Sequence, residues 1–143
     1  MATITAEYAH QHHVPVAASY TDRVISIMKW TYGLVPIVAG LDKFTHILVD
    51  WNKYLAPVVT DVLPLSAGTF MSIVGIIEMV AGVIVLTRPR VGSIVVACWL
   101  VAIALNLLLT GQYYDIAVRD TVMAIGAFSL FMLLKGREQA EGS

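Results

Sequence analysis

Charged residues are scarce in this chain of 143 residues. Asp, Glu, Lys and Arg make up 13% of it, whereas 58% of the residues are hydrophobic. A soluble domain of ordinary composition has about 25% charged residues. A compact water-soluble fold could not bury this much apolar surface, and the mean hydropathy of +0.77 points the same way. The composition therefore predicts a protein that has lipid as its main solvent.

Cysteine is almost absent. The single Cys98 excludes an internal disulfide and a CxxC redox pair, and its apolar surroundings favour an inert packing residue. The nine Lys and Arg residues are scattered, and the net charge is −1. Without a basic run, nucleic acid is not expected as a partner.

Two further patterns are missing. The first residues lack the basic start and apolar core of a signal peptide, so we expect the first spanning helix to direct insertion. Histidine is absent from every long apolar segment, which argues against bis-histidine haem in the membrane. His10, His12 and His13 lie in a polar N-terminal tail, residues 1–20, and we do not expect a metal site there.

What the chain does have is four long apolar segments. We expect transmembrane helices at about 23–44, 66–86, 91–110 and 116–134, because about 20 helical residues cross a hydrocarbon core of about 30 Å. Residues 45–65 are interrupted by prolines, charges, Trp51 and Tyr54, which suits a short interfacial helix with a loop. The predicted fold is an all-α integral membrane four-helix bundle, a single domain over 1–143.

Helix ends and orientation follow from polar residues. The candidate N-caps are Thr21–Asp22, Ser66 and Asp115. We expect the last helix to end at Lys135 and Arg137. With both termini in the cytoplasm, six of the nine Lys and Arg residues lie on that side. This distribution favours a multi-pass membrane protein with both ends cytoplasmic.

Small and polar residues recur at helical spacing within three of the segments. The predicted inward stripes are Lys29, Gly33, Pro36, Gly40 and Lys43 in the first helix, Met71, Gly75, Glu78 and Gly82 in the second, and Cys98, Ala102, Asn106 and Thr110 in the third. Small residues let membrane helices approach closely. On this pattern Asn106 is a hydrogen-bonding link between helices.

Ionisable residues inside the apolar segments are the candidate functional groups. A carboxylate such as Glu78 near the bilayer centre costs at least about 2.5–3.5 kcal/mol unless it is paired, hydrated or neutral. It is either a structural glutamate or a group that carries a proton or binds a ligand. Asp42 and Lys43 should reach the depth of Arg119 and Asp120. We expect a four-charge cluster there, Asp42–Arg119 and Lys43–Asp120 in some pairing, which is either a structural lock or a site.

Three stretches resemble the DoxX-like family of small bacterial four-helix membrane proteins. They are GLVPIVAGLDKF at 33–44, GIIEMVAG at 75–82 and YYDIAVRDTVMAIGAFSL at 113–130, and the resemblance covers about residues 23–134. The positions that match the family pattern are Gly40, Lys43, Glu78, Gly82 and Asp120. The resemblance implies association with membrane redox systems, including quinone-linked ones. Thiol chemistry known in related proteins needs cysteines that this chain lacks.

These observations favour a non-catalytic accessory subunit of a larger bacterial membrane complex, of redox or respiratory type. Its expected contacts are membrane lipid, other membrane subunits and a bound lipid or quinone, with no intrinsic cofactor, metal ligand or catalytic residue. One alternative is a quinone-linked oxidoreductase subunit with an outer-leaflet polar pocket. Another is a small oligomeric transporter or channel with Glu78 on its pathway. The candidate pocket residues are Asp42, Lys43, Glu78, Asn106, Arg119 and Asp120.

Overall fold

Four long helices dominate the structure, a computed structural model that describes residues 16–143. They are α2 (Val16–Thr45), α4 (Ala67–Thr87), α5 (Pro89–Leu109) and α6 (Tyr114–Glu141), with the short helices η1 (Trp51–Tyr54) and α3 (Pro57–Val62) between α2 and α4. Each long helix is apolar and long enough to cross a membrane. The predicted all-α four-helix membrane bundle is confirmed. The histidines of the N-terminal tail lie outside the described residues, and the cytoplasmic location of both termini stays a prediction.

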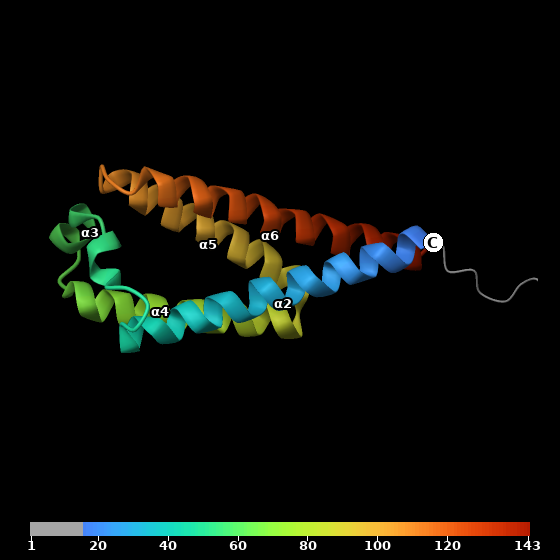
Figure 1. Cartoon of the computed structure of the whole chain (residues 1–143), viewed down its shortest axis with the longest axis horizontal. Coiled ribbons are helices and arrows are strands. Elements are labelled where there is room, and N and C mark those ends of the chain that lie inside the picture. The colour runs from blue at the N-terminus through green and yellow to red at the C-terminus, as the bar shows by residue number, and fades with distance from the viewer. Residues whose placement is uncertain (1–15) are drawn as a thin grey trace, which may run out of the picture.

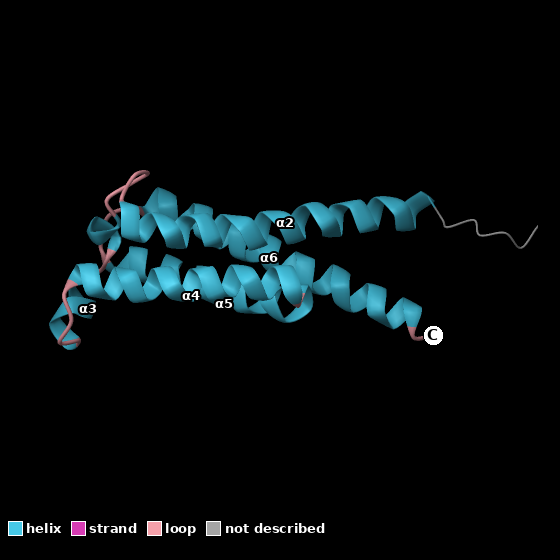
Figure 2. Cartoon of the chain, turned by 90° about the horizontal axis from the view of Figure 1, so that it is seen from below, coloured by secondary structure: helices cyan, strands magenta, loops and turns pink. Residues whose placement is uncertain are grey.

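The four helices form two antiparallel pairs. In Figure 1, α2 runs beside α4 and α5 runs beside α6, while η1 and α3 lie between the two pairs at one end of the molecule. We call this the loop end. The start of α2 and the end of α6 lie at the opposite end, which we call the termini end (Figure 2), and there Arg137 of α6 is 3.5 Å from Asp22 of α2. The loop end is therefore where a non-helical segment enters the space between the pairs.

Two helix boundaries differ from the prediction. The helix α2 begins at Val16, before the expected cap at Thr21–Asp22, and α6 continues to Glu141 rather than ending near 134. Ion pairs hold this extension, because Arg90 pairs with Glu138 and Arg137 lies 3.5 Å from Asp22. The 21 residues of α4 and α5 span about 31 Å, which matches the hydrocarbon core. The longer α2 and α6 extend beyond it.

Of the other two predicted N-caps, one is confirmed and one is wrong. Ser66 caps α4 as predicted, because its hydroxyl accepts a hydrogen bond from the Thr69 amide at 3.2 Å. A single residue, Arg88, separates α4 from α5, and Pro89 begins α5, a position where proline loses no helical hydrogen bond. Asp115 lies in the first turn of α6 instead of capping it.

Glycines bring α2 and α4 into backbone contact. A Cβ atom added to Gly75 would lie 2.7 Å from the Gly40 carbonyl oxygen, and one added to Gly82 would meet the Gly33 carbonyl oxygen. Residues 33 and 40 thus oppose residues 82 and 75 in an antiparallel crossing. The predicted inward faces of both helices are confirmed, since Gly33, Gly40, Gly75 and Gly82 are all buried.

The predicted inward face of α5 was wrong. Cys98 and Ala102 are exposed on the surface of the bundle. The buried side of α5 instead carries Gly92, Ser93, Val96, Ala97, Ala104 and Leu107. Four of these six residues are Gly, Ser or Ala, so the small residues marked the packed face more reliably than the spacing of the polar residues.

A candidate ligand site at the loop end

Lys43 and Glu78 form a buried ion pair. The Lys43 Nζ atom lies 2.5 Å from Glu78 Oε2, and their side chains are 4% and 8% exposed. Helical side chains point toward the N-terminus of their own helix. In the antiparallel α2 and α4, the Lys43 side chain therefore points into the membrane while that of Glu78 points toward the loop end. The two meet near the Gly40–Gly75 crossing.

This ion pair is incompletely hydrogen-bonded. An ammonium group has three donors, yet within residues 16–143 Lys43 donates only to Glu78, and its Nζ atom lies 3.8 Å from the centre of the Trp51 ring. Glu78 Oε1 has one donor, the Trp99 indole, at a long distance of 3.5 Å. The pair therefore keeps an unused N–H donor on Lys43 and an almost free acceptor on Glu78.

Asp120 is a third ionisable group in the same place. It is 3% exposed, and it interacts electrostatically with both Lys43 and Glu78. Its Oδ1 atom accepts hydrogen bonds from Arg119 Nε at 3.2 Å and from Arg119 NH2 at 3.1 Å. The Arg119 side chain is 63% exposed. Asp120 thus connects the buried ion pair with a cation at the surface.

Asp42 does not belong to this ion-pair network. Its Oδ1 atom accepts from the Ile47 and Leu48 amides at 3.0 and 2.9 Å and from the Thr45 hydroxyl. Its Oδ2 atom accepts from the Trp51 indole at 2.7 Å. The carboxylate holds the chain as it leaves α2 and places the Trp51 ring against Lys43.

The predicted four-charge cluster is therefore present only in part, because Lys43 pairs outside it and Asp42 pairs with neither cation. Instead of Asp42–Arg119 and Lys43–Asp120, the structure has Lys43–Glu78 and Arg119–Asp120. Adjacent residues of a helix point in different directions, so Asp42 faces the 46–51 segment while Lys43 faces α4. The similar depth of these charged residues along their helices therefore did not determine which of them form ion pairs.

Asn106 of α5 fixes the far end of the same segment. Its side-chain nitrogen donates to the Tyr54 carbonyl oxygen at 2.7 Å, and its oxygen accepts from the Ala56 amide at 3.1 Å. The predicted hydrogen-bonding link is made to η1 and to the residue before α3, and not to another of the four long helices. Non-helical backbone at membrane depth needs such partners, and Asn106 supplies them to a segment whose Leu55 and Ala56 are buried.

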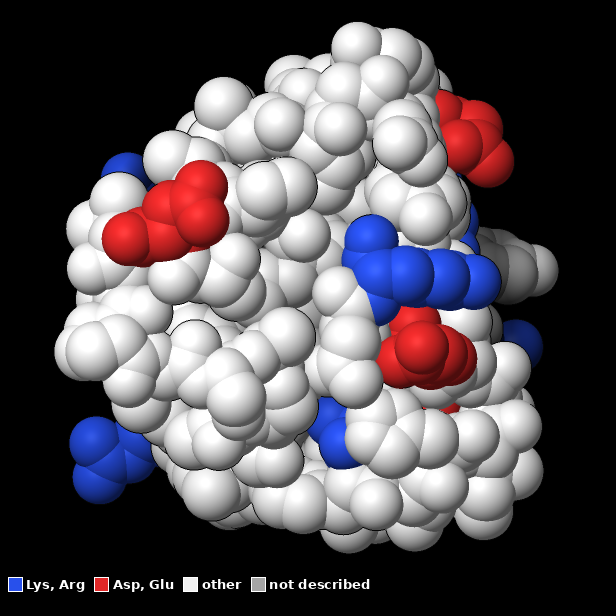
Figure 3. Space-filling view, turned by 90° about the vertical axis from the view of Figure 1, so that its left-hand side faces the viewer, with Lys and Arg blue, Asp and Glu red and all other residues white. Residues whose placement is uncertain are grey.

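Residues 46–56 therefore cover the ion pair through the Trp51 ring. The predicted short helix with a loop is present as η1, and its place at the membrane surface stays a prediction. We call residues 46–56 the cover. Its aromatic rings make edge contacts, with 6.1 Å between the centroids of Trp51 and Tyr54 and 4.8 Å between those of Tyr54 and Tyr113. Figure 3 faces this end and shows a largely uncharged surface on which some acidic and basic side chains lie side by side.

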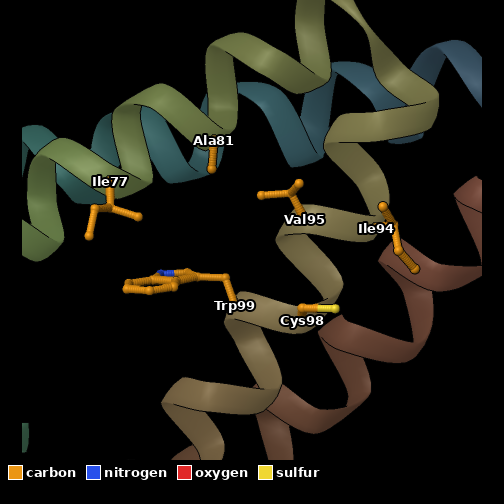
Figure 4. Close-up of a pocket in the computed structure, with 6 residues that line it drawn as sticks. All are labelled: Ile77, Ala81, Ile94, Val95, Cys98 and Trp99. Atoms are coloured by element: carbon orange, nitrogen blue, oxygen red, sulfur yellow. The ribbon is translucent and has the colours of Figure 1, made fainter.

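An apolar groove leads from the lipid-facing surface toward Glu78. It lies between α4 and α5, has a volume of ≈ 350 Å³, and is lined by Ile77, Ala81, Ile94, Val95, Cys98 and Trp99. In Figure 4 the Trp99 ring extends from α5 toward α4 near Ile77. Because the same indole contacts Glu78, the groove and the ion pair share a wall.

Two residues of the site were missed by sequence reasoning. Trp51 was assigned only to the interface, although its indole and ring contact Asp42 and Lys43. Trp99 was not singled out at all. A signal existed, because a tryptophan in the middle of an apolar helix needs an acceptor for its N–H group, and Glu78 is that acceptor.

Comparison of the chain with protein-family models, curated protein sequences and solved structures finds no match. Within the part of the chain that the structure describes, no group of three or more His, Cys, Asp or Glu side chains is arranged to hold a metal ion. The case for a function therefore depends on the geometry of the loop end.

Proposed function

We propose that this multi-pass membrane protein binds the head group of a membrane quinone at the Lys43–Glu78 pair. The observation that carries the proposal is the unused hydrogen-bonding capacity of this buried pair. A quinone carbonyl accepts hydrogen bonds, and the hydroxyl of its reduced form donates them. Lys43 Nζ would donate to the carbonyl, and Glu78 Oε1 would accept from the hydroxyl. Bound quinone supplies two-electron redox chemistry, and these residues hold and orient it.

The buried position of the pair supports a ligand site over a purely structural role. An ion pair buried in a protein is often no more stabilising than apolar residues of the same volume, and ionisable residues inside a membrane mark functional sites by default. The Trp51 ring of the cover provides an aromatic face against Lys43, and Asp120 is buried as well. Such a face suits contact with a flat, conjugated ring.

The groove between α4 and α5 supports a ligand that arrives from the bilayer. Its lining is almost wholly apolar, and its residues Ile77, Val95 and Cys98 lie on the exposed surface of the bundle. An isoprenoid tail could lie in this groove while the head group passes Trp99 toward Glu78. The volume is within the range of about 300–1,000 Å³ typical of small-molecule sites.

Binding of a short-chain benzoquinone to the purified protein in lipid nanodiscs tests the proposal. Trp fluorescence quenching or calorimetry gives the affinity. Lys43→Met should weaken binding about 10-fold or more, because a hydrogen bond to a charged group contributes about 1.5–3 kcal/mol. Val95→Trp should weaken it by filling the groove.

Val101→Trp is the matched control for the groove, since Val101 is exposed on α5 but does not line it. An alkane of the same chain length without carbonyl groups is the control ligand. Equal affinity of the wild type, Lys43→Met and Val95→Trp for the quinone would overturn the proposal.

A second role is supported by the termini end. There α2 and α6 extend beyond the span of α4 and α5 and are joined by the Arg137–Asp22 ion pair. We propose that this extension docks the chain, as an accessory subunit, onto a redox complex of the bacterial cytoplasmic membrane. The resemblance to the DoxX-like family supports the same role. Purification in mild detergent with mass spectrometry should recover partner subunits, and removal of residues 136–143 should release them without loss of quinone binding.

A further inference from the structure

A second groove lies between α2 and α6 at the termini end. It has a volume of ≈ 740 Å³, and its lining includes Asp22 of α2 and Phe128, Met132, Leu133, Gly136 and Arg137 of α6. In Figure 1, α4 and α5 end before α2 and α6 do at this end of the molecule. Every lining residue in the described part of the chain belongs to α2 or α6, so these two helices form the groove.

The groove is apolar at one end and charged at the other. Phe128 and Met132 are exposed apolar residues of its lining. Arg137 follows nine residues after Phe128, which is about 14 Å along the helix, and Asp22 of α2 lies beside it. Tyr20, which is also exposed, belongs to a residue type that lies at the level of the lipid head groups. The groove therefore has the same division as a phospholipid, with an apolar part and a charged part.

The charged end of the groove has a weak ion pair. Arg137 NH1 lies 3.5 Å from Asp22 Oδ1, and the two side chains are 42% and 59% exposed. An exposed pair of this kind contributes little to stability, so a ligand that offers better partners can separate it. Arg137 Nε also lies 3.8 Å from Glu141 Oε1, which gives one cation against two carboxylates. Such a rim disfavours an anionic head group and favours one that has both a phosphate and a cation.

We propose that this groove binds a phospholipid with an ethanolamine head group. The Arg137 guanidinium donates to two phosphate oxygens, a geometry that arginine favours, and the Asp22 carboxylate accepts from the ammonium. One acyl chain lies along Phe128 and Met132. A choline head group has no N–H donor for Asp22. A glycerol head group brings a phosphate without a cation to a rim that already has an excess of negative charge.

The lipid site is separate from both proposed roles of the chain. It lies at the end opposite to Lys43 and Glu78, and its lining belongs to a single chain. Neither a quinone nor a partner subunit is needed for the lipid to bind, so the inference goes beyond those roles and can fail or succeed without them. The purified full chain is sufficient for the test.

Native mass spectrometry measures the affinities of the chain for phosphatidylethanolamine, phosphatidylcholine and phosphatidylglycerol with identical acyl chains. The wild type should bind the ethanolamine lipid about 5-fold more tightly than the other two, which is the gain expected of one exposed ion pair. Asp22→Asn should bring the ratio of the ethanolamine and choline affinities to about one. Arg137→Gln should weaken both lipids, because both lose the partner of their phosphate. Lys135→Gln, which removes an exposed cation of α6 outside the groove, should change neither affinity.

Gly136→Trp tests the groove itself. A Cβ atom added at Gly136 meets nothing within 4 Å, so the larger side chain fills the groove without displacing protein atoms and should weaken the binding of all three lipids. Ile125→Trp, at an exposed position of α6 outside the groove, should leave binding intact. An unchanged affinity ratio in Asp22→Asn, tighter binding of phosphatidylglycerol than of phosphatidylethanolamine, or a lipid-free dimer that Gly136→Trp disrupts would overturn the proposal.

Discussion

Lys43 Nζ and Glu78 Oε2 are 2.5 Å apart although 35 residues separate them in the chain. The glycine contacts between α2 and α4 bring the two helices close enough for the side chains to meet. The pair is therefore a product of helix packing, and its energetics can be tested by single and double substitutions.

Replacement of one partner of this pair should be more harmful than replacement of both. Lys43→Met leaves Glu78 buried without its cation and should lower the free energy of unfolding by up to about 3–5 kcal/mol. The double variant Lys43→Met with Glu78→Leu should recover most of the loss. Reversible unfolding in detergent micelles measures these differences. A double variant less stable than both single variants would contradict the expectation.

Asn106 should control the order of the cover. Asn106→Leu removes the acceptor of the Ala56 amide and the donor to the Tyr54 carbonyl, which should cost about 1–3 kcal/mol for the buried groups left unpaired. Hydrogen–deuterium exchange should show loss of protection at residues 54–56 in particular. Thr60→Ala, which alters an exposed hydroxyl of α3, should leave that protection intact. Unchanged exchange in Asn106→Leu would show that other contacts hold the cover.

The backbone contact of α2 and α4 should tolerate no side chain at Gly40. In Gly40→Ala the added methyl group meets the Gly75 carbonyl oxygen and the Met79 side chain, and such overpacking costs about 1–3 kcal/mol. Gly68→Ala is a matched control, because nothing lies within 4 Å of the position of its Cβ atom. Alanine at 68 should be neutral or stabilising, since it favours a helix. Equal thermal stability of the two variants would rule out the close crossing.

Cys98 should be accessible from lipid. It is exposed on α5, and as the single cysteine of the chain it needs no background substitutions. In membranes, an apolar maleimide should label it slowly, because only the thiolate reacts and lipid disfavours that form, whereas a large charged maleimide should not label it. A spin label at Cys98 should also be relaxed by oxygen, which partitions into lipid, more than by a water-soluble paramagnetic reagent. Labelling by the charged reagent alone would place Cys98 in an aqueous environment.

Much of the fold could be predicted because apolar length and periodicity act locally. The four helices and the inward faces of α2 and α4 follow from runs of apolar residues and from Gly33, Gly40, Gly75 and Gly82. The end of α6 was not predictable in the same way. Its polar last turns are held by Arg90 and Asp22, which belong to other helices and leave no trace in the local pattern.

For the candidate site, sequence selected most of the residues but not their partners. Lys43, Glu78 and Asp120 are conspicuous because ionisable groups are costly in an apolar segment. Their pairing depends on the rotation of each helix. The path of residues 46–56 decides that Asp42 and Asn106 bind the cover and that Trp51 contacts Asp42. The rotation of α5 brings Trp99 to Glu78. Depth can be counted along a helix, whereas rotation is fixed by packing against its neighbours.

The sequence by itself determined that this chain has four membrane-spanning helices and a few buried charges that need compensation. The free-energy cost of a polar group in lipid depends on its depth, and depth can be read from the position of the residue along its helix. Only the tertiary structure decided that Lys43 meets Glu78 and that Trp51 covers them. These contacts require an antiparallel crossing at two glycines and a segment tied at both ends by Asp42 and Asn106. Such long-range geometry depends on how all the helices pack together, and no single segment determines it.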